Sequence, residues 1–144
     1  MTATRVTFLI VDDDEVSIMA IRRALARQGI ENPVVEAGDG LEALSILKDG
    51  VRKPFVVLLD INMPRMTGLE FLAALRDDPS LHDTTVFILT TSDAPQDIGQ
   101  AYAHNVAGYI LKEDAYKSIA AAVGLLDVYT DAVVLPTDQN SHPC

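Results

Sequence analysis

Short apolar runs in this chain of 144 residues end in side chains that can do chemistry. Four such runs are followed by carboxylates, hydroxyls or an amine, in the order Asp12–Asp14, Asp60, Thr90–Ser92 and Lys112. The runs are rich in β-branched and aromatic residues, which is typical of strands. If the carboxyl ends of these strands meet at one edge of a sheet, the four groups form a single site.

Carboxylates gathered in this way require a cation, since two unit charges about 4 Å apart repel by roughly 4 kcal/mol at an effective dielectric of 20. Oxygen ligands select a hard cation, and a small carboxylate set that leaves room for water and phosphate oxygens suits Mg²⁺. A carboxylate beside Mg²⁺ and an ammonium can also attack phosphorus, because the cations neutralise the oxygens of the transferred group. The sequence therefore predicts that Asp60 accepts a phosphoryl group.

Strands and helices alternate along the chain and would position these groups. Strands are predicted at 6–11, 33–37, 55–60, 85–90 and 107–111. Helices are predicted at 15–28, from the N-cap Asp39 to Gly50, over Leu69–Leu75 before the Asp78-Pro79 pair, at 95–104 and at 114–128. Five βα units in series indicate a parallel sheet with helices on both faces. Right-handed crossovers then give an α/β, doubly wound, five-stranded parallel sheet of the flavodoxin-like type.

The chain resembles a response-regulator receiver domain, the (βα)5 module of two-component signalling. The resemblance runs over residues 6–127 and rests on the stretches FLIVDDDE, Gly29 to GDGLEAL, LLDINMPRMTG, ILTTS and GYILK. A lone pair of aspartates is unspecific, whereas the ordered set centred on LLDINMPRMTG is highly specific. We therefore expect a receiver domain over residues 1–128 and a C-terminal tail over residues 129–144.

The resemblance implies a metal and phosphoryl site built from four residues. Asp60 would be the phosphoacceptor. Asp13 would bind Mg²⁺ directly, and Asp12 would bind it chiefly through water. Asn62 would offer its backbone carbonyl to the metal, with its side chain at the mouth of the site.

The same resemblance assigns the groups that respond to phosphorylation. Thr90 would hydrogen-bond the phosphoryl oxygens, and Lys112 would pair with them. Tyr109 would be the switch aromatic, which turns inward when Thr90 moves. Two positions depart from the family. Glu113 follows Lys112 where receivers usually have proline, so the loop after Lys112 is expected to differ from the family's. Thr91 stands where a smaller residue is usual, which predicts narrower access to the phosphoryl group and slower turnover of it.

The implied function is that of a response regulator, which is no enzyme beyond its own phosphorylation and dephosphorylation. The sequence after the last predicted helix is too short for an output domain, so we expect signalling by protein contact. The regulator would act as a stand-alone effector or as a phosphate shuttle in a phosphorelay. Its partners would be a sensor histidine kinase and a downstream target or phosphotransfer protein. The VDDDEVSIMAIRRAL start, ILTTS, the Lys112-Glu113 pair and the VVLP tail are similar to regulators paired with phytochrome-type histidine kinases.

An alternative of another class fits part of the sequence. Asp12, Asp14 and Val16 match the DxDx(T/V) motif of haloacid-dehalogenase-type phosphatases, in which the first aspartate is the nucleophile and Mg²⁺ is required. That family usually needs a longer chain and a further acidic pair, and it leaves LLDINMPRMTG unexplained. For Asp14, a role as N-cap of the first helix is the better interpretation.

Composition excludes several other classes of function. The formal net charge is −10, with 11 Lys and Arg against 21 Asp and Glu, so nucleic acid and anionic membranes would repel the chain. No apolar run approaches the ~20 residues of a membrane span, and the N-terminus lacks the pattern of a signal peptide. The single cysteine, Cys144, rules out an internal disulfide. We expect a cytoplasmic protein that binds other proteins.

The C-terminal tail contains an apolar, β-branched stretch, Ala132–Leu135, although the five βα units are complete before it. The predicted fifth helix has small residues, Ala120–Ala122, beside its apolar stripe. Exposure of both would leave a large apolar patch for a monomer. We therefore expect a homodimer in which each tail covers its partner. A tail that folds back on its own domain is the open alternative.

Overall fold

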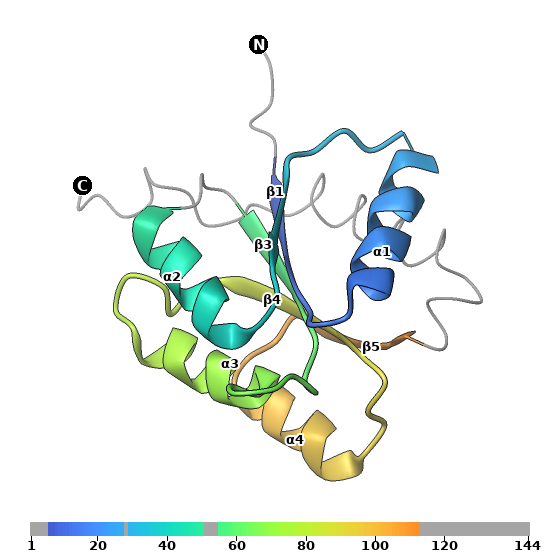
Figure 1. The fold of residues 1–144 in the computed structure, drawn as a ribbon. Helices are drawn as coiled ribbons and strands as arrows, with labels where there is room; N and C mark the ends of the chain where they lie inside the picture. Colours follow the sequence, from blue (N-terminus) through green and yellow to red (C-terminus); the bar gives the residue numbers. More distant parts are fainter. Residues whose placement is uncertain (1–5, 28, 51–54, 113–144) are drawn as a thin grey trace.

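The structure, a computed structural model, describes residues 6–27, 29–50 and 55–112. Its strands form one parallel sheet in the order β2-β1-β3-β4-β5 (Figure 1). The strands are β1 Thr7–Val11, β2 Val34–Ala37, β3 Phe55–Leu59, β4 Thr85–Thr90 and β5 Gly108–Leu111. The helices among the described residues are α1 Glu15–Arg27, α2 Gly40–Gly50, α3 Gly68–Asp77 and α4 Pro95–Ala103.

The predicted α/β, doubly wound parallel sheet is confirmed. Each described element lies where the sequence predicts it, and its ends agree with the prediction or differ by one residue, except that α3 ends two residues beyond Leu75. The predicted fifth helix, the tail and Glu113 lie outside the described residues. None of the described helices has both the length and the apolar character needed to span a bilayer.

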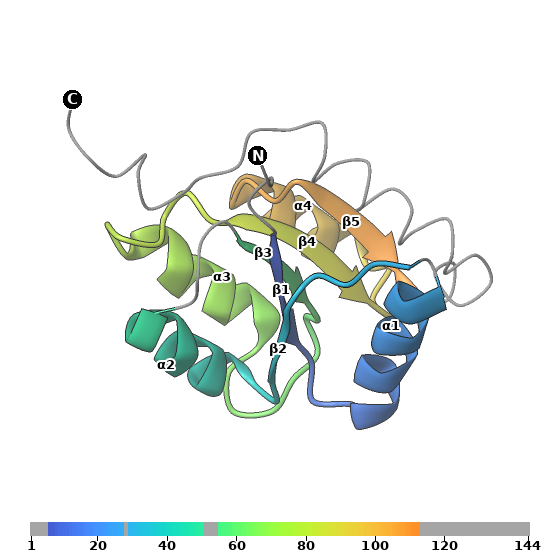
Figure 2. The same cartoon turned by 90° about the horizontal axis from the view of Figure 1, so that it is seen from above.

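The sheet separates two apolar layers. Along β1, Leu9 and Val11 pack with residues of α2, α3 and α4, whereas Phe8 and Ile10 pack with residues of α1. The same alternation holds along β3, because successive side chains of a strand point to opposite faces. Both strands are buried throughout, and helices lie on both sides of the sheet (Figure 2). This burial explains the unbroken apolar runs in the sequence.

Short polar side chains cap the N-termini of α1, α2 and α3. The predicted N-cap Asp39 is confirmed, since its Oδ1 accepts the backbone N–H of Glu42 at 2.8 Å. Asp14 caps α1 in the same way and accepts a backbone N–H two residues later at 3.0 Å. Helix α3 begins with a capping box between Thr67 and Glu70. These contacts satisfy N–H groups that have no partner within the helix.

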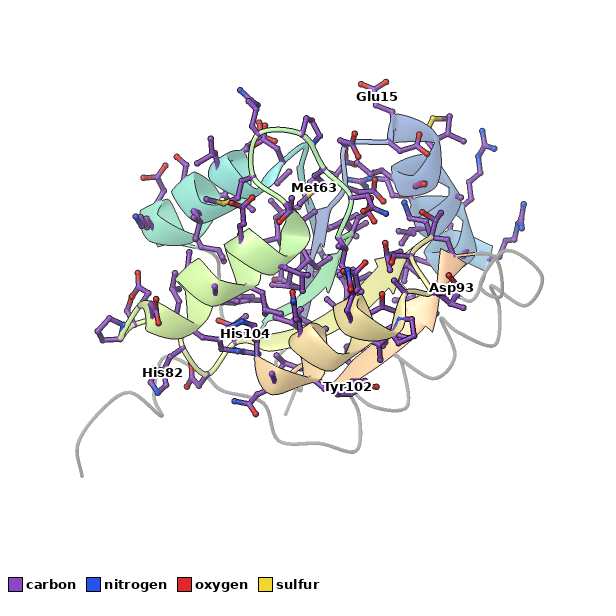
Figure 3. All side chains as sticks on the ribbon, turned by 90° about the horizontal axis from the view of Figure 1, so that it is seen from below. Glu15, Met63, His82, Asp93, Tyr102 and His104 are labelled. Carbon is purple, nitrogen blue, oxygen red and sulfur yellow. The ribbon has the colours of Figure 1, made fainter. Side chains whose placement is uncertain are left out.

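Arg76, in the last turn of α3, organises the opposite end of the sheet. Its guanidinium donates hydrogen bonds to the backbone carbonyls of His82, Thr84, His104 and Asn105 at 2.6 to 3.0 Å. His82 and His104 lie in the loops that precede β4 and β5 (Figure 3). One planar guanidinium with five N–H donors thus joins two loops that are distant in sequence.

Candidate functional site

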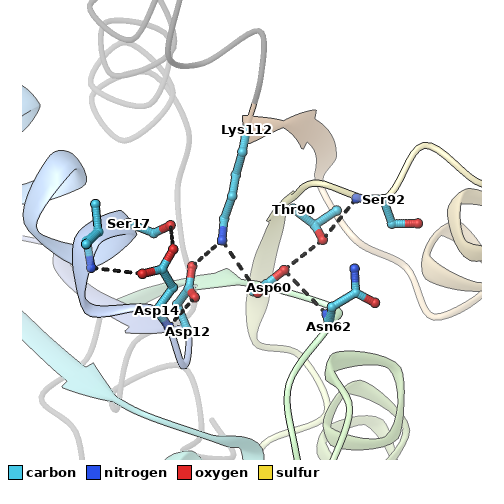
Figure 4. A network of polar contacts seen from close by, with 9 residues as sticks. Asp12, Asp14, Ser17, Asp60, Asn62, Thr90, Ser92 and Lys112 are labelled. Carbon is cyan, nitrogen blue, oxygen red and sulfur yellow. Dashed lines mark hydrogen bonds and ion pairs between the residues drawn. The ribbon is translucent and has the colours of Figure 1, made fainter.

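The polar groups that follow the predicted strands converge at the carboxyl end of the sheet. Asp12 follows β1, Asp60 follows β3, Thr90 ends β4 and Lys112 follows β5 (Figure 4). The strands are parallel, so these ends lie along one edge of the sheet. Together with Asp13, these residues form what we call the carboxylate site.

Asp60 lies at the centre of this site and is only 5% exposed. Its backbone N–H donates to the carbonyl of Val11 at 2.9 Å, which ties the end of β3 to β1. The Thr90 hydroxyl donates to Oδ1 at 2.7 Å, and the Lys112 ammonium lies 3.5 Å from Oδ2. The backbone N–H of Asn62 points at Oδ1 from 3.4 Å. Each carboxylate oxygen of Asp60 therefore faces a donor from another segment of the chain.

Asp12 is the second buried carboxylate of the site, at 3% exposure. Its Oδ2 accepts from Lys112 Nζ at 2.7 Å, and its Oδ1 accepts the Asp14 N–H at 2.9 Å. Burial raises the pKa of Asp12, and the hydrogen bond from Lys112 opposes that rise. Asp13 is exposed, so its carboxylate meets the site from the solvent side. The ammonium of Lys112 thus bridges two buried carboxylates and leaves the third to the solvent side.

The donor set fits a hard divalent cation. Carboxylate oxygens of Asp12, Asp13 and Asp60 lie within 4.8 Å of one another. Oxygen ligands with one exposed approach suit Mg²⁺, which keeps several waters when it binds. When all three carboxylates are ionised, three negative charges face the one positive charge of Lys112, and a divalent cation balances the remainder. The side chain of Asn62 is exposed beside them, and the contact of its carbonyl with a metal stays a prediction.

The two predicted switch residues are connected through a third residue. Tyr109 donates its hydroxyl to the backbone carbonyl of Ser92 at 2.7 Å, and the Ser92 N–H points at Thr90 Oγ1 from 3.4 Å. Burial raises the pKa of Tyr109, whose ring packs against the apolar layer beneath α2, α3 and α4. Thr91, next to Thr90, is exposed. Thr90 and Tyr109 therefore both contact Ser92 in the loop after β4, and their role as a switch stays a prediction.

The sequence predicts Ser92 only as one of the hydroxyl residues after the fourth strand, and its contact with α4 is new. Its hydroxyl donates to Asp97 Oδ2 at 2.5 Å, which links the loop to the first turn of α4. The available signal is its position, because Ser92 stands two residues after Thr90 and three before Pro95, the residue that starts α4. A hydroxyl just before a helix start often bonds to the first turn.

The sequence matches one protein family over most of its length. The family model described as "Response regulator receiver domain" matches residues 8–124. The probable methanogenesis regulatory protein FilR2 of Methanothrix harundinacea is 30% identical over 125 residues, which cover 84% of this chain and 81% of FilR2. Response regulator Rcp1 of Synechocystis sp. is 28% identical over 134 residues, which cover 89% of this chain and 91% of Rcp1.

Solved structures agree with the sequence comparison. The phosphorylated cyanobacterial phytochrome response regulator RcpA superposes with a TM-score of 0.83 at 30% identity, over 93% of this chain and 100% of RcpA. The Mn²⁺-bound form of Rcp1 superposes with a TM-score of 0.78 at 27% identity, over 91% of this chain and 99% of Rcp1. The similarity extends over nearly the whole length of both relatives and confirms the flavodoxin-like sheet.

Proposed function

Since this chain belongs to the response regulator receiver family, we propose that it is a stand-alone two-component regulator that accepts a phosphoryl group on Asp60 with Mg²⁺. The observation that carries the proposal is the setting of Asp60. Its buried carboxylate lies 2.7 Å from the hydroxyl of Thr90 and 3.5 Å from the ammonium of Lys112. Two further carboxylates approach to within 4.8 Å. Such a group has a nucleophilic oxygen, a cation and a hydrogen-bond donor at one point.

In the proposed reaction, an oxygen of Asp60 attacks the phosphorus of a phosphohistidine. The new O–P bond forms as the N–P bond breaks, and the released imidazole takes up a proton. Asp12, Asp13, Asp60 and the carbonyl of Asn62 would hold Mg²⁺, which supplies positive charge to the phosphoryl oxygens when bound. Lys112 neutralises the same oxygens. The Thr90 hydroxyl shifts its hydrogen bond from Asp60 to a phosphoryl oxygen, and the Tyr109 contact with the shared loop carries that change outward.

The proposed phosphoryl donor is a sensor histidine kinase. Because RcpA is a phytochrome response regulator, a phytochrome-type kinase is the first candidate. Output would pass through protein contacts in the cytoplasm, to a downstream target or to a phosphotransfer protein of a relay, with no nucleic acid bound. The match with Rcp1 over 91% of its length supports a regulator of the same class.

Labelling with a small phosphodonor and Mg²⁺ tests this function. We expect one acid-stable phosphoryl group that base and hydroxylamine remove, located by peptide mapping on Asp60. The variant Asp60→Asn should not be labelled, because an amide is not a nucleophile towards phosphorus. Equal labelling of that variant would contradict the proposal. A label on Asp12 would instead favour the haloacid-dehalogenase-type phosphatase, which the family match does not support.

We also propose that residues 129–144 form a dimerisation arm. The support is the sequence of Ala132–Leu135, which is apolar although no strand or helix of the βα series needs it. Light scattering on the full chain and on a chain ending at Thr130 measures its role. We expect a homodimer that becomes monomeric on truncation. A monomeric full chain, or a truncated chain that stays equally dimeric, would refute the role of the arm.

A further inference from the structure

The loop between β3 and α3, residues 60–67, connects the proposed phosphoacceptor to a helix and contains Asn62. Both ends of this β3–α3 loop are fixed by the backbone, since Asp60 donates to Val11 and the N–H of Gly68 donates to the Ile61 carbonyl at 2.8 Å. In its middle, the backbone hydrogen bonds run from Met63 to Ile61 and from Met66 to Pro64. Those bonds join the loop to itself and do not fix its position against the rest of the protein.

Arg65, at the tip of the β3–α3 loop, makes a contact that does fix it. Its guanidinium forms an ion pair with Oδ2 of Asp39, whose Oδ1 caps α2. The side chain of Asp39 is only 7% exposed, whereas that of Arg65 is 69% exposed. Arg65 also has a φ of +65°, a conformation that is uncommon outside glycine and that persists where the surroundings hold it. The start of α2 therefore anchors the tip of the loop.

The ion pair between Arg65 and Asp39 differs in kind from an ordinary surface pair. A buried carboxylate that loses its cation is left uncompensated, so Asp39 holds its partner firmly. The pair between Arg22 and Glu36 is the contrasting case, because 47% and 40% of those side chains are exposed. Pairs of that kind contribute little, since water and salt screen them. The chain thus offers a matched control for the loss of one arginine.

We propose that Asp39 and Arg65 are positioning residues for the metal site. By fixing the tip of the β3–α3 loop, they hold the carbonyl of Asn62 where a cation on the carboxylate site can use it. Only Met63 and Pro64 stand between Asn62 and Arg65, and neither has much freedom, because Met63 is 6% exposed and packs in the core and Pro64 has a restricted φ. A change in the position of the tip therefore reaches the Asn62 peptide over a short and stiff connection. This inference rests on the proposed function and extends it to residues that touch neither the metal nor the phosphoryl group.

Two neutral variants separate the ion pair from local backbone effects. Asn favours the left-handed region, so Arg65→Asn keeps the turn and loses the guanidinium. Asn is also a good N-cap, so Asp39→Asn keeps the cap of α2 and loses the charge. Calorimetric titration of the full chain with Mg²⁺ measures Kd for each variant. The control Arg22→Ala should bind as the wild type does, and Asp13→Ala should lose binding.

We expect a roughly 3- to 10-fold rise in Kd for either variant, at or below the range seen when groups that touch metal ligands are removed. The double variant should bind no more weakly than the weaker single variant, because one interaction is lost in all three. Arg65→Lys should recover part of the affinity. The thermal unfolding of each variant checks that it is folded, and the exposed Arg65 carries the test alone if Asp39→Asn does not fold.

A wild-type Kd for Mg²⁺ in folded Arg65→Asn would overturn the inference. An equal rise of Kd in the control Arg22→Ala would overturn it too, as would a wild-type protein that is labelled on Asp60 but binds no Mg²⁺. Labelling of the wild type is scored separately. If the wild type is not labelled on Asp60, the proposed function fails. If it is labelled and binds Mg²⁺ while both variants keep the wild-type affinity, the inference alone fails.

Discussion

The close approach of Gly68 to the end of β3 leads to our most direct prediction. Helix α3 begins at Gly68, and a Cβ there would lie 2.2 Å from the carbonyl oxygen of Asp60 and 2.7 Å from the Cα of Ile61. Both are backbone atoms at the end of a buried strand, so neither can rotate away. The substitution Gly68→Ala therefore forces the start of α3 and the peptide of Asp60 apart.

The size of the effect follows from these distances. Since carbon–oxygen contacts lie at about 3.3–3.6 Å, the helix and the strand must separate by about 1 Å. Overpacking of this kind costs about 1–3 kcal/mol, and the stiffer unfolded chain returns about 0.4–1 kcal/mol. We expect Gly68→Ala to lower the free energy of unfolding by about 1–2 kcal/mol and to slow phosphorylation of Asp60.

Gly40→Ala is the matched control, because its added methyl group meets side chains. The nearest atoms are Cγ and Sδ of Met66, both at 2.8 Å, and then Cβ of Phe71 at 3.1 Å. The thioether of Met66 is flexible and can move, so we expect a change of less than about 1 kcal/mol in the free energy of unfolding. Urea unfolding of both variants at equal m-values measures the difference. Equal stability of Gly68→Ala and the wild type, or a larger loss in Gly40→Ala, would refute this account of the helix start.

Two further variants test contacts at the two ends of the sheet. Thr90→Val removes the buried donor to Asp60 and should lower the free energy of unfolding by about 1.5–3 kcal/mol. Thr90→Ser keeps that hydrogen bond and should lose less stability. Equal losses for the two variants in urea unfolding would argue against the hydroxyl contact. Arg76→Ala leaves four carbonyls without their guanidinium donor and should lower the free energy of unfolding, measured in urea, by about 2–4 kcal/mol. Arg76→Lys should recover little of that stability, since an ammonium lacks the planar arrangement of donors. Normal labelling of Asp60 in both Arg76 variants would show that the effect stays at the far end of the sheet.

The strands and the residues at their tips were predictable because burial on both faces leaves a clear pattern. An apolar run such as Phe55–Leu59 can only be a covered strand in this alternation, and Asp60 at its end must then lie at the edge of the sheet. The N-cap role of Asp39 is equally local, since a short acceptor before an apolar stripe starts a helix. Each of these inferences uses residues within one turn or one strand.

The contacts of Arg65 and Arg76 could not be predicted in this way. Arg65 meets Asp39 across 26 residues, and the four acceptors of Arg76 are backbone carbonyls, which every residue has. Such contacts depend on where loops lie after the sheet has formed. The role of Ser92 depends in the same way on the distance between its loop and Tyr109. Sequence patterns therefore identify the groups of the site, while the supports that hold them come from the assembled fold.

The bridge made by Lys112 also has a consequence for the order of folding. Lys112 follows β5, at the edge of the described sheet, and its partner Asp12 stands 100 residues earlier (112 minus 12). Contacts of such separation form late, because a long loop must close before they can contribute. Until β5 docks, Asp12 and Asp60 lack this counter-charge, and when β5 opens they lose it again. Amide hydrogen exchange in β5 should therefore report directly on how often the site comes apart in the native protein.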